Sequence, residues 1–230
     1  MEEALAILGY VGSSVILNVY PSDIVVTRCS LIPISVATPT LVPTPTAVPT
    51  PVPTPTAVPT PAQATGAVFV NKWGNYGQFQ GPHGIAVATD GSVYVADTGN
   101  SIQKFTAEGA FVGKWGRQGT RDGQFEWAEA IAVAPDGSVY VADSGNHRIQ
   151  KFAPEGMFTS KWGRQGTRDG EFLSPQGVAV APDGSVYVAD ISNHRIQKFT
   201  SEGVFVSKWG TEGTGDGQFI QPATVAVASE

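Results

Sequence analysis

The chain has 230 residues, which is enough for one domain of ordinary size with a tail. Its formal net charge is −6 and its pI is about 5.0, which argues against a sequence-independent nucleic-acid surface, because such a surface needs a basic stripe. The single cysteine, Cys29, excludes an intramolecular disulfide and a Cys/His zinc motif.

Residues 1–36 form an apolar N-terminal segment with two interpretations. Residues 4–22 carry no charge and are long enough for a membrane span. Glu2 and Glu3 precede them, however, where a signal peptide carries Lys or Arg. The segment is therefore either a candidate anchor or a disordered region or remnant of a preceding domain, with short strands at 14–20, 23–29 and 31–37.

Residues 37–65 are rich in proline and threonine. The string VPTPTAVPTP occupies residues 42–51 and recurs unchanged at 52–61. Proline fixes φ and removes a backbone donor, so this composition predicts an extended polyproline II linker. Such linkers resemble the stalks of secreted or surface-attached bacterial proteins, from which we expect an extracellular or cell-surface location.

Residues 66–230 form a repeat array. The string KWG recurs at Lys72, Lys114, Lys161 and Lys208, at intervals of 42, 47 and 47 residues. The shorter first interval reflects two small deletions. A period of this length is typical of propellers and solenoids. The repeats extend over about 75–116, 117–163 and 164–210, with a partial copy at 211–230.

One repeat contains four short strands. In the second copy they are expected at 130–134, 138–143, 147–152 and 157–162. Asp-Gly and Glu-Gly corners separate them, and such corners favour tight turns because glycine accepts positive φ. Four antiparallel strands in each repeat predict an all-β fold, the β-propeller, with one blade per repeat.

The residues that recur in every copy are interpreted as structural. A tryptophan closes each outer strand and is expected to pack against a neighbouring blade. An Asp ends each second strand, three residues before an Asn, and these side chains predict a hydrogen-bonded turn with which an Arg can pair. The residues are Trp73, Trp115, Trp162, Trp209, Asp97, Asp143, Asp190, Asn100, Asn146, Asn193, Arg148 and Arg195.

The strings NHRIQKF, DGSVYVAD and FVxKWG resemble the NHL-repeat family. The resemblance covers about 165 residues and implies a propeller of the six-bladed type. It implies little about function, because function depends on sites carried by the fold.

The repeats do not complete a ring. Three whole blades are about half of a six-bladed circle. An outer strand at 67–73 precedes them and an inner strand at 223–228 follows, and these two are not neighbours within a blade. We expect an open arc with apolar blade faces at both ends, completed by self-association or by further blades.

The candidate ligand-binding positions lie where the repetition breaks. Trp127 stands where other repeats have a small or polar residue, and Glu126 and Glu129 flank it at the start of an inner strand. An aromatic ring with two carboxylates can stack on a sugar or hold a cationic group. His83 and Gln176 occupy the position of Glu129 in the neighbouring repeats and complete the candidate set. The alternative is repeat drift, with Trp127 filling a gap left by a missing proline.

No catalytic or metal site is expected. A zinc site needs three converging ligands. Only His83 lies near the expected channel, whereas His147 and His194 fall early in third strands, away from the axis. The peptidylglycine amidating lyases, which resemble this family, use histidine-bound metal, but the match does not extend to a ligand set here. We therefore expect no metal, no cofactor and no enzymatic activity.

The sequence is compatible with three functions. The first is a non-enzymatic NHL-type segment that binds a protein or glycan on an extracellular stalk. The second is a fragment of a propeller enzyme, similar to the amidating lyases or another lyase, that lacks its catalytic blades. The third is an intracellular adaptor similar to the NHL portion of TRIM-type ubiquitin ligases, without their RING or B-box Cys/His residues. A nucleic-acid partner is not expected.

Overall fold

The structure is a computed structural model that describes residues 4–10, 13–19, 24–30, 68–73, 79–97 and 99–228, the first four ranges by their backbone alone. The Pro/Thr-rich linker at 37–65 lies outside these residues. The described residues form four four-stranded antiparallel sheets and contain no helix long and apolar enough to cross a membrane.

The first sheet consists of β1 (Ala4–Tyr10), β2 (Ser13–Val19), β3 (Ile24–Ser30) and β4 (Val68–Trp73). The second consists of β5 (Pro82–Val87), β6 (Val93–Asp97), β7 (Ser101–Phe105) and β8 (Phe111–Trp115). The third consists of β9 (Ala128–Val133), β10 (Val139–Asp143), β11 (Arg148–Phe152) and β12 (Phe158–Trp162). The fourth consists of β13 (Pro175–Val180), β14 (Val186–Asp190), β15 (Arg195–Phe199) and β16 (Phe205–Trp209), with the 3-10 helix η1 (Ile191–Asn193) between β14 and β15.

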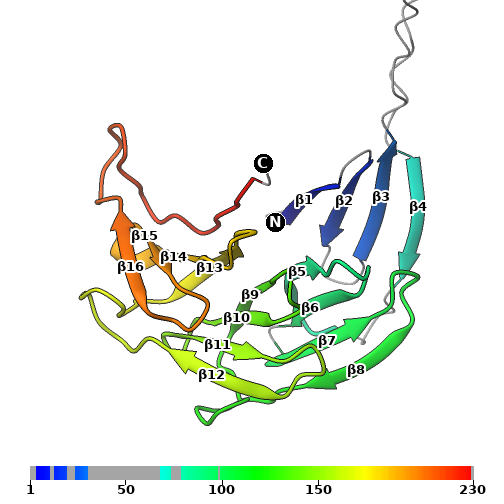
Figure 1. The fold of residues 1–230 in the computed structure, drawn as a ribbon, viewed down its shortest axis with the longest axis horizontal. Coiled ribbons are helices and arrows are strands. Elements are labelled where there is room, and N and C mark those ends of the chain that lie inside the picture. Colours follow the sequence, from blue (N-terminus) through cyan, green and yellow to red (C-terminus); the bar gives the residue numbers. More distant parts are fainter. Residues whose placement is uncertain are drawn as a thin grey trace, which may run out of the picture.

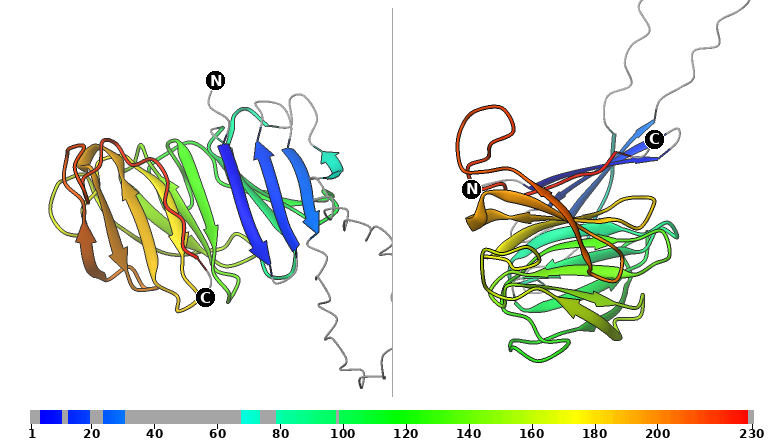
Figure 2. Two further views of the ribbon diagram at one scale, coloured as in Figure 1. Left: turned by 90° about the horizontal axis from the view of Figure 1, so that it is seen from above. Right: turned by 60° about the vertical axis from the view of Figure 1, so that its left-hand side comes forward.

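The last three sheets are the predicted blades. In each of them the strands lie side by side in the order in which they follow along the chain, from inner to outer. The prediction of three complete four-stranded blades is confirmed. The sheets succeed one another around an open arc, and they stand beside one another when seen from above (Figure 1, Figure 2).

The outer strand β4 has three partners from the N-terminal segment. It pairs antiparallel with β3, from Ile24 opposite Trp73 to Arg28 opposite Val68. The strands β2 and β1 continue this sheet. Of the short strands expected in residues 1–36, those at 14–20 and 23–29 correspond to β2 and β3. The strand expected at 31–37 lies outside the described residues, and β1 was not expected. Together β1, β2 and β3 supply the inner and middle strands that the repeat pattern lacks in front of β4.

The predicted corners are tight turns. Gly137 has φ +84°, and its N–H donates to Ala134 O at 2.9 Å. Asp136 Oδ1 accepts the N–H of Ser138 at 2.9 Å, so the carboxylate closes the turn between β9 and β10. Gly156, with φ +88°, takes the same role between β11 and β12.

The second strands β6 and β10 are buried on both faces, because their blades lie between neighbours. All five residues of β6 and of β10 are buried. Between blades, the Trp115 ring lies 6.0 Å from the Phe152 ring of the next blade. In the same way the Trp162 ring lies 5.9 Å from the Phe199 ring. These tryptophans therefore pack one blade against the next, and Trp209 is 43% exposed.

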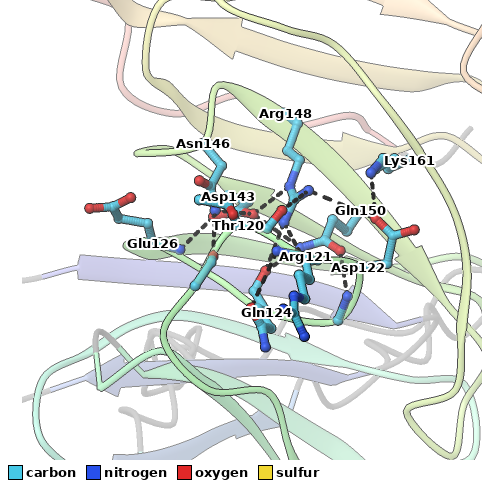
Figure 3. Close-up of polar contacts among 12 residues, drawn as sticks. Thr120, Arg121, Asp122, Gln124, Glu126, Asp143, Asn146, Arg148, Gln150 and Lys161 are labelled. Carbon is cyan, nitrogen blue, oxygen red and sulfur yellow. Dashed lines mark hydrogen bonds and ion pairs between the residues drawn. The ribbon is translucent and has the colours of Figure 1, made fainter.

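A buried carboxylate ties each blade to the loop that enters it. Asp143, at the end of β10, has no solvent contact (Figure 3). It accepts hydrogen bonds from Glu126 N, Asn146 Nδ2, Arg148 Nε and Gln150 Nε2 at 2.7–3.1 Å. Burial raises the pKa of the Asp143 carboxyl, and the hydrogen bonds from Glu126, Asn146 and Arg148 oppose that rise. We call this network the carboxylate joint.

Arg148 extends the joint to the entering loop, residues 117–126. Its Nη1 donates to Thr120 O at 2.9 Å, and its Nη2 donates to Arg121 O and Gln124 O at 2.8 and 2.9 Å. A guanidinium with its donors in a fixed fork suits this arrangement, because it can hold three carbonyls and one carboxylate at once. The loop is thereby fixed to β10 and β11.

The joint recurs in the third blade and is reduced in the first. Asp190 accepts from Asn193, Arg195 and Gln197 at 2.8–3.1 Å. In the first blade Ser101 stands where the others have Arg, and its buried Oγ has no hydrogen-bond partner. Asp97 there accepts backbone N–H groups, and the donors are Gln80, Gly81 and Gly99 at 2.8–3.3 Å.

A second contact links the end of each second strand to the next blade. Asn100, His147 and His194 all have positive φ, of 63°, 54° and 52°. Each accepts a backbone N–H from the start of the following repeat, and the three donors are Trp127 at 2.9 Å, Ser174 at 3.0 Å and Gln221 at 3.2 Å. We call these contacts the blade clasps.

The clasps correct two predictions. Asn100 was expected to correspond to Asn146 and Asn193, but its conformation and its hydrogen bond make it the counterpart of His147 and His194. The deletion in the first repeat therefore removes the Asn of the pattern and not the His position. The two histidines also lie in turns before β11 and β15, not within the third strands.

The predicted inner strand at 223–228 does not form. Residues 222–228 have no strand pairing. They nevertheless lie against β13, since a Cβ at Gly177 would be 2.9 Å from Thr224 Cα. A strand needs a ladder partner, and within the described part of the chain no second strand of this blade follows.

Removal of one partner from the carboxylate joint should destabilise the fold strongly. We expect Arg148→Ala to lower the free energy of unfolding by about 3–5 kcal/mol, because it leaves a buried carboxylate without its cation. Arg164→Ala is the matched control. Arg164 is 75% exposed and pairs with Glu171 at 2.8 Å, so its loss should change stability by less than about 1 kcal/mol. Urea unfolding would measure both, and equal effects would contradict the role of the joint.

The blade clasp should require an acceptor and not an imidazole. We expect His147→Asn to leave stability within about 0.5 kcal/mol, because Asn100 performs this role in the first blade. His147→Gly accepts the positive φ but removes the acceptor, and it should lower stability by about 1 kcal/mol. Thermal unfolding of the two variants would separate them, and an Asn variant as unstable as the Gly variant would argue against the clasp.

Candidate binding site at the start of the inner strands

The inner strands β5, β9 and β13 lie close together, and the ends at which they begin carry the candidate residues. A Cβ at Gly84 would lie 2.8 Å from Ala130 Cα, so only glycine permits this approach of β5 to β9. His83 of β5, Glu129 of β9 and Gln176 of β13 occupy corresponding positions near these strand starts.

The structure brings His83 and Glu129 together across the junction of two blades. His83 Nδ1 lies 2.7 Å from Glu129 Oε2. The His83 side chain is 53% exposed and that of Glu129 is 18% exposed. The pair therefore presents an imidazole to solvent with a carboxylate behind it.

Trp127 is held outward by its backbone. It precedes β9, has φ +59° and leaves 60% of its surface exposed. Ser174 and Gln221, at the same position in later repeats, also have positive φ, of 56° and 52°. The left-handed conformation thus belongs to the position, and the clasp to Asn100 fixes it.

Glu126 is anchored by its backbone and free at its side chain. Its N–H donates to Asp143 Oδ1 at 2.8 Å, and its carbonyl accepts from Gly145 N at 2.8 Å. Figure 3 shows the carboxylate pointing away from the carboxylate joint. No other described residue makes a hydrogen bond or ion pair with it. The joint therefore fixes the backbone of Glu126, which precedes Trp127 in the sequence, and leaves both side chains available to a ligand.

Gln176 is the member of the set that the contacts do not join. It is half-buried on β13, and its side chain makes no hydrogen bond to the other four residues. The candidate residues thus comprise one bonded pair, His83 and Glu129, and one exposed segment at Glu126 and Trp127.

Sequence reasoning missed Asn100 as a residue of this region. Its side chain is the acceptor that holds the Trp127 backbone. The signal was present in the chain spacing, because Asp97 and Ser101 are four positions apart where Asp143 and Arg148 are five apart.

The described residues contain no group of three or more His, Cys, Asp and Glu side chains that could hold a metal ion. His83 and Glu129 form a contact between only two side chains of these types, and His147 and His194 accept the hydrogen bonds of blade clasps.

Comparison with known proteins supports the fold. A family model described as NHL repeat matches residues 79–105, 125–152 and 172–199. A search of curated proteins finds no significant match.

Two solved structures align with nearly the whole chain. A structural genomics protein of unknown function from Bacteroides thetaiotaomicron is 14% identical, with a TM-score of 0.64, and the alignment covers 97% of this chain and 53% of that one. Virginiamycin B lyase from Staphylococcus aureus is 14% identical, with a TM-score of 0.52, and the alignment covers 98% of this chain and 59% of that one. The chain therefore spans somewhat more than half the length of these structures, and at this identity they show the fold alone.

Each of the three matched segments runs from the residue that enters a blade to the end of its third strand. The predicted resemblance is thus confirmed at the level of each repeat. The chain contains three NHL repeats, and each of them contributes one four-stranded blade of a β-propeller segment.

Proposed function

We propose that this propeller segment is a non-enzymatic binding module for a protein or a glycan, and that residues 126–129 make the contact. The observation that carries this proposal is the exposure of Trp127. A tryptophan that merely filled a gap between repeats would be buried, whereas this one is 60% exposed.

The backbone of Trp127 strengthens the argument. Positive φ is unfavourable for a bulky side chain, and burial does not offset that penalty here. The chain tolerates Ser at the equivalent position 174, so the fold does not require an aromatic ring there. A strained and exposed aromatic side chain is a reason to look for a ligand.

The surrounding charges define what could bind. The Glu126 carboxylate is unpaired among the described residues, and the Glu129 carboxylate lies 2.7 Å from His83 Nδ1. An indole face stacks on the apolar face of a sugar ring, and carboxylates accept hydrogen bonds from the hydroxyl groups of the sugar. The Trp127 indole and the Glu126 carboxylate together would hold a Lys or Arg side chain through cation–π and ionic contacts. The net charge of −6 disfavours nucleic acid.

The remaining parts of the proposal concern placement. The composition of the Pro/Thr-rich segment, residues 37–65, supports a location at the cell surface or outside the cell. Because this segment joins β3 to β4, which pair in one sheet, it is not a stalk between the propeller and a separate attachment point. Blades beyond those described, or self-association, would complete the ring.

A binding module and a part of a metal-dependent propeller enzyme differ in a simple measurement. We expect elemental analysis of the purified chain to show no stoichiometric transition metal. One equivalent of bound zinc would contradict the non-enzymatic proposal, since a catalytic zinc needs three protein ligands and a water.

The binding contact should depend on the indole. We expect Trp127→Ser to weaken binding at least tenfold, while the fold is retained because Ser174 occupies the equivalent position. A glycan array and a peptide library would identify the ligand, and calorimetry would compare the variants. Glu126→Gln tests the carboxylate, and a cationic ligand should lose several-fold in affinity.

The control for this experiment is Met157→Ala. Met157 is also exposed and apolar, but it lies in the turn before β12. Its replacement should leave affinity unchanged. Binding that is indifferent to Trp127→Ser, or equally sensitive to Met157→Ala, would reject the proposed contact.

A further inference from the structure

The blade of β5–β8 contains a buried negative charge that no described cation balances. Asp97, at the end of β6, is 1% exposed, and none of the ion pairs among the described residues includes it. In the next two blades the corresponding carboxylates each pair with an arginine, and these pairs are Asp143 with Arg148 and Asp190 with Arg195. Buried charges in folded proteins are paired with an opposite charge or coordinate a metal ion.

A serine takes the ladder position of that arginine. Asp97 lies opposite Ser101 in the pairing of β6 with β7, as Asp143 lies opposite Arg148 in the pairing of β10 with β11. Residues directly opposite each other project to the same face of a sheet. Ser101 is 1% exposed, and its Oγ has no hydrogen-bond partner within the described part of the chain. A buried hydroxyl without a partner therefore lies on the same face as a buried carboxylate without a cation, and such a group calls for a water molecule or an ion.

The two oxygens of the Asp97 carboxylate are not satisfied equally. Oδ1 accepts the N–H groups of Gln80, Gly81 and Gly99, at 3.0, 2.8 and 3.3 Å. From the described residues Oδ2 accepts one hydrogen bond, at 3.2 Å, and its donor is again Gln80 N. In Asp143, by contrast, Oδ2 is the oxygen that takes the arginine Nε, at 2.7 Å. Oδ2 of Asp97 is therefore the oxygen whose counterparts have a positive partner.

From these contacts we propose that an alkali-metal cation, Na⁺ or K⁺, binds between Asp97 Oδ2 and Ser101 Oγ, in the place that a guanidinium takes in the next two blades. The charge of the site selects the ion. A monovalent cation neutralises one carboxylate, as arginine does, whereas Ca²⁺ would leave a net positive charge buried. Carboxylate and hydroxyl oxygens suit hard cations, and neither residue offers the sulfur or imidazole that transition metals prefer.

The cation fixes the turn between β6 and β7. That turn carries Asn100, whose Oδ1 accepts the N–H of Trp127 at 2.9 Å. The same carboxylate also holds the backbone of Gln80 and Gly81, directly before β5. The ion thus takes the part in the first blade that Arg148 takes in the second. This role is independent of any ligand at residues 126–129.

The test compares thermal unfolding of the full chain in sodium, potassium and tetramethylammonium chloride at the same ionic strength. Tetramethylammonium is too large for the site and controls for general screening. We expect Na⁺ or K⁺ to raise the midpoint saturably, by about 3–6 °C at roughly ten times the dissociation constant. Hydrogen exchange should locate the effect, with slower exchange of the amides of Gln80, Gly81 and Trp127.

Matched variants identify the ligands. Asp97→Asn removes the charge and should abolish the difference between the salts. Ser101→Ala removes only the hydroxyl, so the chain should still fold and should need several-fold more salt for the same shift. Ser144→Ala is the control, because Ser144 is a buried serine beside Asp143, in a blade that has its own arginine. It should leave the salt response unchanged.

Three results would overturn the proposal. Equal midpoints in the three salts would show that the site holds water and no cation. An unaltered salt response in Ser101→Ala would show that the hydroxyl is not a ligand. An ion-specific shift whose amide protection lies away from β6, β7 and their contacts would place the ion elsewhere. All three can be read even if Asp97→Asn does not fold.

Discussion

A buried carboxylate ends the second strand of each of the three NHL blades, and the entering loop is arranged around it. In the second and third blades an Arg side chain neutralises this charge and holds three loop carbonyls at the same time. Because a buried charge is stable only with its partners in place, the loop has one conformation. That conformation sets the backbone of Glu126, and through Glu126 it sets the direction of Trp127.

The junctions between blades use a different principle. An indole lies over a glycine, and a tyrosine and a lysine reach a single carbonyl behind it. The outer tryptophan of a blade is therefore partly covered where the next blade is present, as Trp115 and Trp162 are. Stability in such an array is approximately a sum of blade terms and junction terms, so an uncovered junction leaves a contribution to stability unrealised.

Much of the fold could be predicted, because its determinants are local. Asp-Gly and Glu-Gly corners fix the turns, and apolar strands between them fix the blades. The pairing of β3 with β4 could not be predicted, since a long linker separates them and no repeat motif marks β1–β3. The role of Asn100 was hidden because a one-residue deletion can be placed on either side of an Asn in the sequence. The prediction of a strand at 223–228 was wrong because an apolar pattern does not supply a ladder partner.

At the candidate site the sequence indicated the residues that deviate from the repeat. It could not indicate that His83 and Glu129 meet, because that contact depends on the approach of two blades at Gly84.

The hydroxyl and ammonium donors always point from one blade to the turn of the following blade. The blade clasps likewise run only between a turn and the start of the following repeat. The arc therefore has a polarity, as a filament has a plus and a minus end. At each described junction the two blades therefore contribute chemically different surfaces, and a blade in the reverse orientation could not make the same contacts.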